Sequence, residues 1–524
     1  MIFPLKYTRW FYYTGLLGII AGMSLSKPAV STGIIMCGVL WVSELDFANR
    51  LKRLKNQPFF WISLALILLH VVGLFWSENM QYAVKDIKTK LPLIVLPFIF
   101  STSKAVDLRN EWKYIYFVFI GSLIACTFLS FGIYFHWIKP AQFTEADMRT
   151  MIFGVSGVRL ALFICLAICF LFYGMYKTTS NTWRLVYIII AGWFLFFLNF
   201  IESGTAIVFL LVLFLFSLVY VIWKKFGLKW RIIFISAIVI GFFAGAYVVY
   251  NTVSGLFVLK EAPVKSTHSK YGEIYYFDKS LNYIENGYVV GKYIAWVELE
   301  LAWQQRSKIP FKGRDKLHQS IYATILRYLN SKGGVKDKEA LDKLTEQDIR
   351  NIENGIANAS YLEMYGWQRR LLQIVYEFVS YGADRSNPFG NSVTQRFEYW
   401  RIGWNLFKQS PLIGLGTGDV DDAYDEVYKH YKFEIEHRHK LRAHNQYLTM
   451  AITFGIIGFI VFMVYAFSML WVKGYKKYRY VALSFFIIML FSFLSEDTLE
   501  TQSGVTFIAF FHTFFNLRSS ENQL

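Results

Sequence analysis

Long apolar runs separated by short polar segments make up most of the chain. A helix needs about 20 mainly apolar residues to cross the hydrocarbon core of a bilayer. The pattern therefore predicts an all-α polytopic membrane protein with about twelve transmembrane helices. The predicted spans are 10–26, 29–46, 58–76, 89–102, 114–136, 157–176, 184–200, 204–223, 231–250, 444–472, 479–495 and 503–517.

One connection, residues 251–443, is much longer than the others. Its segments YIAWVELELAWQQR, HQSIYATILRYL and SYLEMYGWQRRLLQIVYEFVSYG have apolar residues at helical spacing, and SKGGVKD and GADRSNPFGN have turn residues. The segment VTQRFEYWRIGWNLFKQ is another predicted helix, ended by Ser410 and Pro411. We expect three parts: a membrane domain over 1–250 with spans one to nine, a large helical cap over 251–443, and a membrane domain over 444–524 with spans ten to twelve.

The short loops predict the orientation of the chain. Lys and Arg are enriched in KYTR, NRLKRLK, KTTSNTWR, KKFGLKWR and KGYKKYR, whereas the alternate loops ESGT and SEDTLETQ contain neither. Cytoplasmic loops carry the excess of cations. The N-terminus, and with an even number of spans the C-terminus, are therefore expected in the cytoplasm. The cap is expected on the outer face, which is the periplasm in a bacterial inner membrane.

Composition agrees with a membrane protein and argues against nucleic acid as a partner. The chain is 55% hydrophobic and only 17% charged, whereas soluble domains are about 25% charged. The net charge is +17, yet residues 251–443 hold 27 Lys and Arg against 24 Asp and Glu. Most of the excess therefore flanks the predicted spans, where topology requires it.

The cysteines offer neither a disulfide framework nor a zinc site. All of them fall inside predicted spans, where we expect them to face lipid or the helix core. They are Cys37, Cys126, Cys165 and Cys169.

The stretch from Arg438 to Phe459, RHKLRAHNQYLTMAITFGIIGF, places cations and a histidine directly before a long apolar helix. Arginine forks match phosphate oxygens in pairs, and a helix N-terminus adds backbone N–H donors for an anion. Histidine can move a proton near neutral pH. The alternative is a belt of cations that anchors the tenth span at the membrane surface. Charge alone leaves both interpretations open.

Two further patterns favour simple structural roles. The loop GLGTGD, Gly414–Asp419, resembles a phosphate-binding loop, but it lacks the preceding strand that such a loop requires, which favours a tight turn. The segment around His430, Glu434, Glu436, His437, His439 and His444 could suggest a metal site. Its neighbours Arg438, Lys440 and Arg442 would repel a dication, so no metal is expected there.

Acidic residues and one arginine mark predicted outer boundaries of the spans. Glu496, Asp497 and Glu500 lie in the loop SEDTLETQ between the last two spans. They either form structural ion pairs, or orient arginines and accept a proton from a sugar hydroxyl. Arg159, at the outer start of the sixth span, is a functional candidate because ionisable groups are costly near the bilayer.

Several of these segments together resemble the O-antigen ligase and polymerase superfamily. PLIGLGTGD, AHNQYL and AITFGIIGF resemble its signature, and TQRFEYWRIGWNLFKQSP resembles its arginine-containing helix upstream. SFLSEDTLETQSGVTFIAFF is similar to the C-terminal spans of Bacteroidetes-type members. The specific resemblance runs from about Gly390 to Phe514.

The resemblance implies an inverting glycosyltransferase of lipopolysaccharide biosynthesis that needs no metal or cofactor. Such enzymes transfer a glycan from undecaprenyl diphosphate to a sugar hydroxyl of lipid A–core on the periplasmic face. His444 occupies the family histidine of the HNxYL motif, and Arg396 occupies the loop arginine ahead of it. These two are the predicted catalytic residues, with Asn445 beside them as a substrate-binding candidate.

One position departs from the family pattern. Gly204 stands where the family often has a second arginine, in ESGT instead of a Ser-Arg motif. The missing cation must come from elsewhere, and Glu202 would lie near the site. The candidates for binding the diphosphate or the acceptor are Arg159, Arg369, Arg370 and Arg442.

The resemblance leaves alternatives that share the same donor. A polymerase of O-antigen or another polysaccharide, or a protein O-oligosaccharyl ligase, would use the same diphosphate chemistry with another acceptor. From a different class, a polysaccharide transporter or flippase would also have twelve spans, but the repeat symmetry common in transporters is not evident. The expected partners are the lipid-linked glycan donor, a glycan acceptor and membrane lipids.

Overall fold

The computed structural model describes residues 5–44, 46–103, 108, 111–138, 153–201, 203–254, 258–261, 263–384, 393–431, 435, 440–472 and 478–517. The chain forms two compact units. Unit 1 comprises Met1–Lys139, Met151–Ser217 and Arg396–Leu524; unit 2 comprises Pro140–Thr150 and Leu218–Gln395. Residues 396–443, which the sequence assigns to the cap, thus belong to unit 1.

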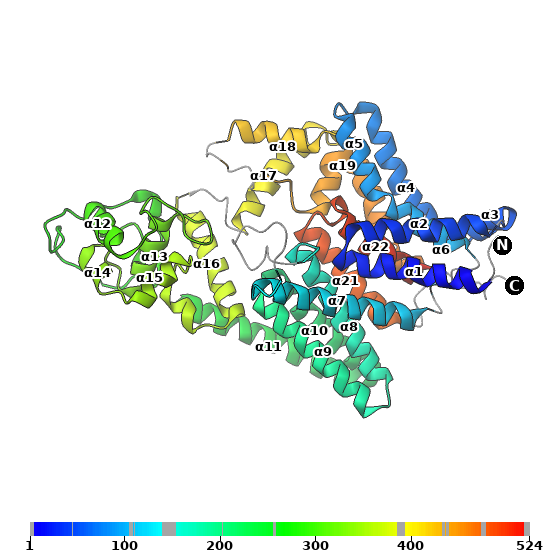
Figure 1. Cartoon of the computed structure of the whole chain (residues 1–524), viewed down its shortest axis with the longest axis horizontal. Helices are drawn as coiled ribbons and strands as arrows, with labels where there is room; N and C mark the ends of the chain where they lie inside the picture. The colour runs from blue at the N-terminus through cyan, green and yellow to red at the C-terminus, as the bar shows by residue number, and fades with distance from the viewer. Residues whose placement is uncertain are drawn as a thin grey trace. The chain divides into compact units, whose positions relative to one another are not determined.

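The described part of unit 1 is mainly helical (Figure 1), and each predicted span within it overlaps one or two helices. Its N-terminal half contains α1 (Leu5–Leu25), α2 (Lys27–Ser43), α3 (Phe47–Lys55), α4 (Pro58–Val72), η1 (Gly73–Trp76), α5 (Met80–Lys90), α6 (Pro92–Thr102), α7 (Trp112–Tyr134), α8 (Gly157–Lys177), α9 (Asn181–Phe200) and most of α10 (Gly204–Lys225). Its C-terminal part contains most of α17 (Thr394–Gln409), then α18 (Val420–Lys429), α19 (Gln446–Phe467), α20 (Met469–Val472), α21 (Arg479–Ser495), η7 (Thr498–Glu500) and α22 (Gln502–Asn516).

The core of unit 1 lies around α22. Every residue from Ser503 to Asn516 is buried, and the helix packs against α1, α2 and α6 (Figure 1). Phe507, Phe511 and Phe515 contact Phe485 of α21 through their rings. Because other helices bury α22 along this whole length, it forms the centre of the bundle. All four cysteines are buried and free, as expected.

Seven helices in the described part of the chain are long and apolar enough to cross a membrane. They are Pro58–Trp76, Trp112–Tyr134, Gly157–Lys177, Asn181–Phe200, Gly204–Lys225, Leu228–Val248 and Gln446–Trp471, with shorter apolar helices at Lys27–Ser43 and Arg479–Ser495. The predicted class, an all-α membrane protein, is therefore confirmed. The total of twelve crossings and the side of the membrane on which each loop lies stay predictions.

Unit 2 contains the end of α10, α11 (Leu228–Ser254) and a small domain. The domain consists of η3 (Lys279–Leu281), the antiparallel pair β1 (Ile284–Glu285) and β2 (Tyr288–Val289), α12 (Trp296–Arg306), α13 (Ile321–Lys332), α14 (Lys338–Asp342), α15 (Glu346–Glu353), η4 (Ala359–Glu363) and α16 (Gly366–Asp384). Each helical pattern read from the sequence here is a helix. Trp303, Ile325, Leu341 and Ile352 belong to a core that is separate from the core of unit 1.

The glycine loop crosses α19 where that helix is kinked. Gly455 has φ 62° and ψ −163°, which interrupts the helix. Leu415 and Gly416 donate backbone N–H groups to the carbonyls of Ile452 and Thr453 at 2.9 and 3.0 Å. These N–H groups therefore bind protein carbonyls rather than a phosphate, which supports the interpretation of GLGTGD as a tight turn.

Candidate functional site

The two predicted catalytic residues meet at a carboxylate that lies far from both in sequence. Arg396, in the first turns of α17, donates from Nη2 to Oε1 of Glu496 at 2.9 Å. His444, just before α19, places Nδ1 3.4 Å from the other oxygen, Oε2. Glu496 follows α21, so three separate segments of unit 1 converge on one group.

Exposure distinguishes the three side chains. The side chain of Glu496 is 8% exposed, whereas those of Arg396 and His444 are 23% and 28% exposed. The ring of His444 lies 5.9 Å from the ring of the fully buried Tyr399, and its Nδ1 is buried without a hydrogen-bond partner among the described residues. The carboxylate is thus a buried anchor, and the arginine and the histidine remain accessible.

Asp497 fixes the backbone that carries His444. Its carboxylate accepts N–H bonds from His444 at 3.0 Å and Asn445 at 3.1 Å, and a hydroxyl bond from Thr449 at 2.7 Å. A carboxylate at the N-terminus of a helix is favourable because the first N–H groups there have no partner within the helix. His444 itself has φ 46°, a left-handed conformation that is uncommon for a residue with a side chain.

The acidic character of Glu496 is set by its neighbours. Burial raises the pKa of its carboxyl, but the contact with His444 and the positive charges of Arg396 and Arg159 outweigh burial, so the pKa lies below its ordinary value. An opposite charge close by favours the ionised form of a carboxyl. Glu496 is therefore a carboxylate at neutral pH, and it can hold two cationic groups.

A second ionic cluster supports the same loop. Lys90 is buried at the end of α5 and donates from Nζ to Asp86 at 2.5 Å and to Glu500 at 2.9 Å. Glu500 accepts from the amide of Gln446 at 3.1 Å, and Gln446 accepts the N–H of Leu499 at 2.8 Å. These bonds join α5, the loop after α21 and the first turn of α19.

Two of the predicted substrate-binding residues lie at these clusters. Arg442 places Nε 2.9 Å from Asp421 and Nη2 3.5 Å from Glu500, so ion pairs within the protein hold its guanidinium. Arg159 donates to Ser156 at 3.1 Å, and its charge acts on Glu496. Its Nε is buried without a hydrogen-bond partner in the described part of the chain. Of these two arginines, Arg159 is the better candidate for binding a further anion.

The other predicted residues are placed as follows. Asn445 caps α19, with its side chain accepting from the N–H of Leu448 at 3.1 Å. Arg369 and Arg370 lie on α16 in unit 2, where Arg370 contacts Gln373 and Glu377. Glu202 lies outside the described residues, as do Glu434, Glu436, His437, Arg438 and His439. No group of three or more His, Cys, Asp or Glu residues suited to a metal occurs in the described ranges.

Sequence reasoning left open whether Glu496 and Asp497 orient arginines or form structural ion pairs, and it did not include them among the predicted site residues. It missed Lys90 and Asp86 altogether. The signals were present: three acids stand together in SEDTLE between two apolar runs, and Asp86 and Lys90 have the i, i+4 spacing of a helical ion pair. It also missed α18, although Val420, Tyr424 and Tyr428 repeat at helical spacing and are buried.

The fold and the site define an all-α membrane protein with accessible arginine and histidine side chains held by a buried carboxylate. Residues 355–463 match the family model described as O-antigen ligase. This stretch contains Arg396, the glycine loop and His444, so the resemblance read from those motifs is confirmed. No curated protein matches the chain.

Proposed function

We propose that this protein is an inverting glycosyltransferase that moves a glycan from undecaprenyl diphosphate to a sugar hydroxyl of lipid A–core. The observation that carries the proposal is the convergence of Arg396 and His444 on Glu496, with both catalytic candidates inside the matched O-antigen ligase domain. A cation must neutralise the negative charge of the diphosphate as it leaves, and a base must take the proton of the attacking hydroxyl. Arg396 supplies the cation and His444 supplies the base, and both lie beside Glu496.

The acceptor's proton goes to His444. A carboxylate beside Nδ1 favours the tautomer that carries the proton on Nδ1 and leaves a lone pair on Nε2. Nε2 then accepts the hydroxyl proton while the hydroxyl oxygen forms its bond to the anomeric carbon. Glu496 stabilises the imidazolium that results. General-base catalysis of this kind contributes about 10²–10⁴-fold.

Arginines bind the diphosphate leaving group and neutralise its charge. The bond from the anomeric carbon to the diphosphate oxygen breaks, and its electron pair remains on the diphosphate. Arg396 has a planar fork of N–H donors that suits phosphate oxygens, and Glu496 orients it. Arg159, whose charge acts on Glu496, is the arginine that we assign in place of the one absent at Gly204. Electrostatic stabilisation of developing charge is usually the largest catalytic contribution.

Transfer in vitro tests the proposal. The purified full-length protein is incubated with undecaprenyl-diphosphate glycan and lipid A–core, and the product is resolved on a gel. We expect wild-type protein to form glycosylated core, and Arg396→Ala and His444→Ala to form almost none. Near-normal transfer by both variants would remove the site assignment, and absence of transfer by wild-type protein would remove the acceptor assignment.

A deletion strain separates the alternatives that use the same donor. Loss of a ligase leaves lipid A–core without long chains and accumulates lipid-linked polymer. Loss of a polymerase leaves single repeat units on the core, and loss of a protein ligase removes glycans from proteins. A transporter would give no transfer in detergent solution, where no membrane has to be crossed.

A further inference from the structure

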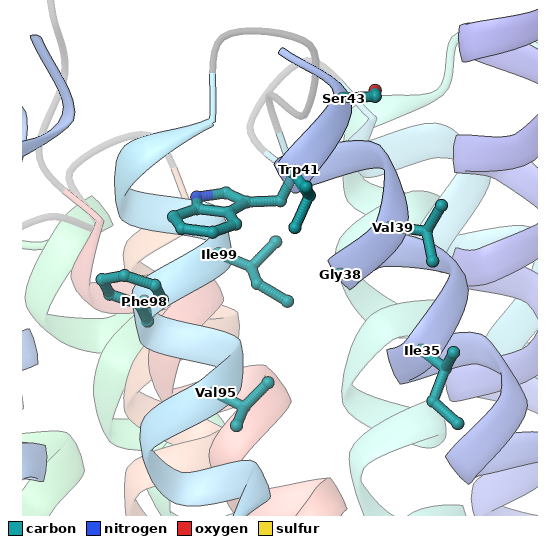
Figure 2. A pocket seen from close by; sticks show the side chains of 9 residues that line it. Ile35, Gly38, Val39, Trp41, Ser43, Val95, Phe98 and Ile99 are labelled. Carbon is teal, nitrogen blue, oxygen red and sulfur yellow. The ribbon is translucent and has the colours of Figure 1, made fainter. Parts of the chain in front are cut away.

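An open apolar groove lies between α2 and α6, away from the ionic site. Its volume is about 620 Å³, and Figure 2 shows Trp41 reaching from α2 towards α6, and Val95 and Ile99 pointing from α6 towards α2. The lining is apolar except for Ser43, and it consists of Ile35, Gly38, Val39, Trp41, Val42, Ser43, Val95, Phe98 and Ile99. A Cβ atom added at Gly38 would meet nothing within 4 Å, so this glycine leaves the space beside α2 open.

Two arginines of α3 contact residues beside the groove. The guanidinium of Arg50 lies 3.8 Å from the ring centroid of Trp41, which lines the groove. Trp41 donates from its indole to the hydroxyl of Thr102 at 2.7 Å, and Arg53 donates to the carbonyl of the same Thr102 at 2.7 Å. Thr102, at the end of α6, therefore bonds both to Trp41 of the groove and to the basic helix α3.

The charges of α3 are only partly compensated. Arg50 lies 3.8 Å from Glu44, and Arg53 lies 2.9 Å from Asp46. Lys52 and Lys55 are exposed and have no ion-pair partner in the described part of the chain. In α3, two acids thus balance the charges of two arginines, and the charges of two lysines remain unbalanced.

We propose that this groove binds an acyl chain of an anionic phospholipid, with the headgroup on α3. An apolar slot suits a hydrocarbon chain, and uncompensated cations beside a membrane helix attract anionic headgroups. A chain of a zwitterionic lipid would fit the slot equally well, but it would gain nothing from Lys52 and Lys55. Charge complementarity therefore selects the anionic lipid.

This lipid site is distinct from the proposed donor site. Lys90, which pairs with Glu500, lies just before the start of α6, whereas Arg53 of α3 binds the carbonyl of Thr102 at the other end of that helix. A helix of the length of α6 spans about 16 Å. The sequence predicts that α3 lies on the cytoplasmic side, so the headgroup would belong to the inner leaflet.

Photo-crosslinking of lipids tests the proposal. The full-length protein is reconstituted with phosphatidylglycerol that carries a diazirine in one acyl chain, or with phosphatidylcholine that carries the same chain. Labelled peptides are then mapped by mass spectrometry. We expect phosphatidylglycerol to label peptides containing 35–43 and 95–99 more strongly, and Lys52→Gln and Lys55→Gln each to reduce this labelling about fivefold.

A filled groove provides the matched control. Gly38→Leu should remove labelling of 35–43 and 95–99, whereas Gly121→Leu, at another helical glycine with open space, should leave it unchanged. The lysine variants keep the test decisive if Gly38→Leu fails to fold, because both lysines are exposed. Equal labelling by the two lipids, or unchanged labelling of the lysine variants, would overturn the proposal. Crosslinks between two protein copies through α2 would assign the groove to a dimer instead and would also overturn it.

Discussion

Nδ1 of His444 lies 3.4 Å from Oε2 of Glu496, and the second oxygen of that carboxylate accepts from Arg396. Glu496 is separated from Arg396 by 100 residues in sequence, yet it touches both of the residues that the family signature singles out. The buried carboxylate forms an ion pair with the arginine and lies beside the imidazole of the histidine. The candidate site therefore includes the loop after α21 as well as the two residues of the sequence motifs.

The first prediction concerns the charge of Glu496. Glu496→Gln keeps the size of the side chain but removes the charge that favours the proton on Nδ1 of His444, and we expect kcat for glycan transfer to fall about 10²-fold or more. Steady-state kinetics with lipid-diphosphate donor measure it. Glu426→Gln, at an exposed ion pair with Lys429, is the control and should transfer normally. A Glu496→Gln enzyme with unchanged kcat would contradict the role of the carboxylate.

The second prediction concerns the backbone at His444. With φ at 46°, this position suits asparagine or glycine better than other residues, because the left-handed region costs about 1–2 kcal/mol per residue with an ordinary side chain. We expect His444→Asn to unfold at a higher temperature than His444→Ala, while both are inactive. Thermal unfolding in detergent followed by intrinsic fluorescence measures the order. An alanine variant at least as stable as the asparagine variant would show that the strain is absent.

The helices were predictable because each apolar run is long and its period is clear. Runs such as 157–176 and 204–223 match α8 and α10 closely at both ends. The short helices α3, α5 and α18 were not predicted, since each has nine to eleven residues and is stabilised by tertiary contacts that a single sequence does not reveal.

The site was only half predictable for a related reason. Arg396 and His444 stand in recognisable local motifs, whereas the contact of Glu496 with both depends on how α17, α19 and α21 pack. The spacing of Lys90 and Asp86 in the sequence is that of an ion pair within a helix. The bond from Lys90 to Glu500, however, joins residues 410 positions apart. No local pattern indicates such a pairing, and acids in a loop are most often solvated.

The third prediction concerns the buried lysine. Lys90→Met leaves the ionised carboxylate of Glu500 and the side chain of Asp86 buried without their shared cation, and breaking a buried ion pair in this way costs about 3–5 kcal/mol. We expect a large decrease in Tm in detergent. Lys338→Met removes an exposed i, i+4 pair with Asp342 and should leave Tm close to the wild-type value, because solvent screens such pairs. Similar Tm values for the two variants would mean that the cluster around Lys90 is not desolvated.

The fourth prediction concerns the crossing of the glycine loop and α19. A Cβ atom at Gly414 would lie 2.3 Å from backbone atoms of Thr453 and Phe454, and φ at Gly414 is +73°. Gly414→Ala should therefore decrease the stability by more than about 1 kcal/mol. Gly121→Ala, on a helix with open space beside it, should be neutral or stabilising. If Gly414→Ala unfolds at the wild-type temperature, the loop does not cross α19 as closely as described.

The fifth prediction concerns Asp86 and pH. Burial and the neighbouring charge of Glu500 raise the pKa of Asp86 from 3.8 to about 7, although Lys90 acts in the opposite direction. The folded state then binds more protons than the unfolded state between about pH 4 and pH 7, so the contribution of Asp86 to stability falls as pH rises through this window. Glu500 has the opposite sign: Lys90 and Arg442 outweigh its burial and lower its pKa below 4.5, so its contribution is lost only as pH falls below that value.

Asp86→Asn removes the contribution that falls with rising pH and leaves Lys90 paired with Glu500. We expect the variant to gain stability relative to wild type as pH rises from 5 to 7, by about 1.4 kcal/mol for each pH unit at most. Thermal unfolding in detergent across this range measures the difference between the two proteins. Asp342→Asn, at an exposed pair, should give a curve parallel to that of wild type. A parallel curve for Asp86→Asn as well would mean that Asp86 is already ionised at pH 5, with Lys90 rather than burial deciding its charge.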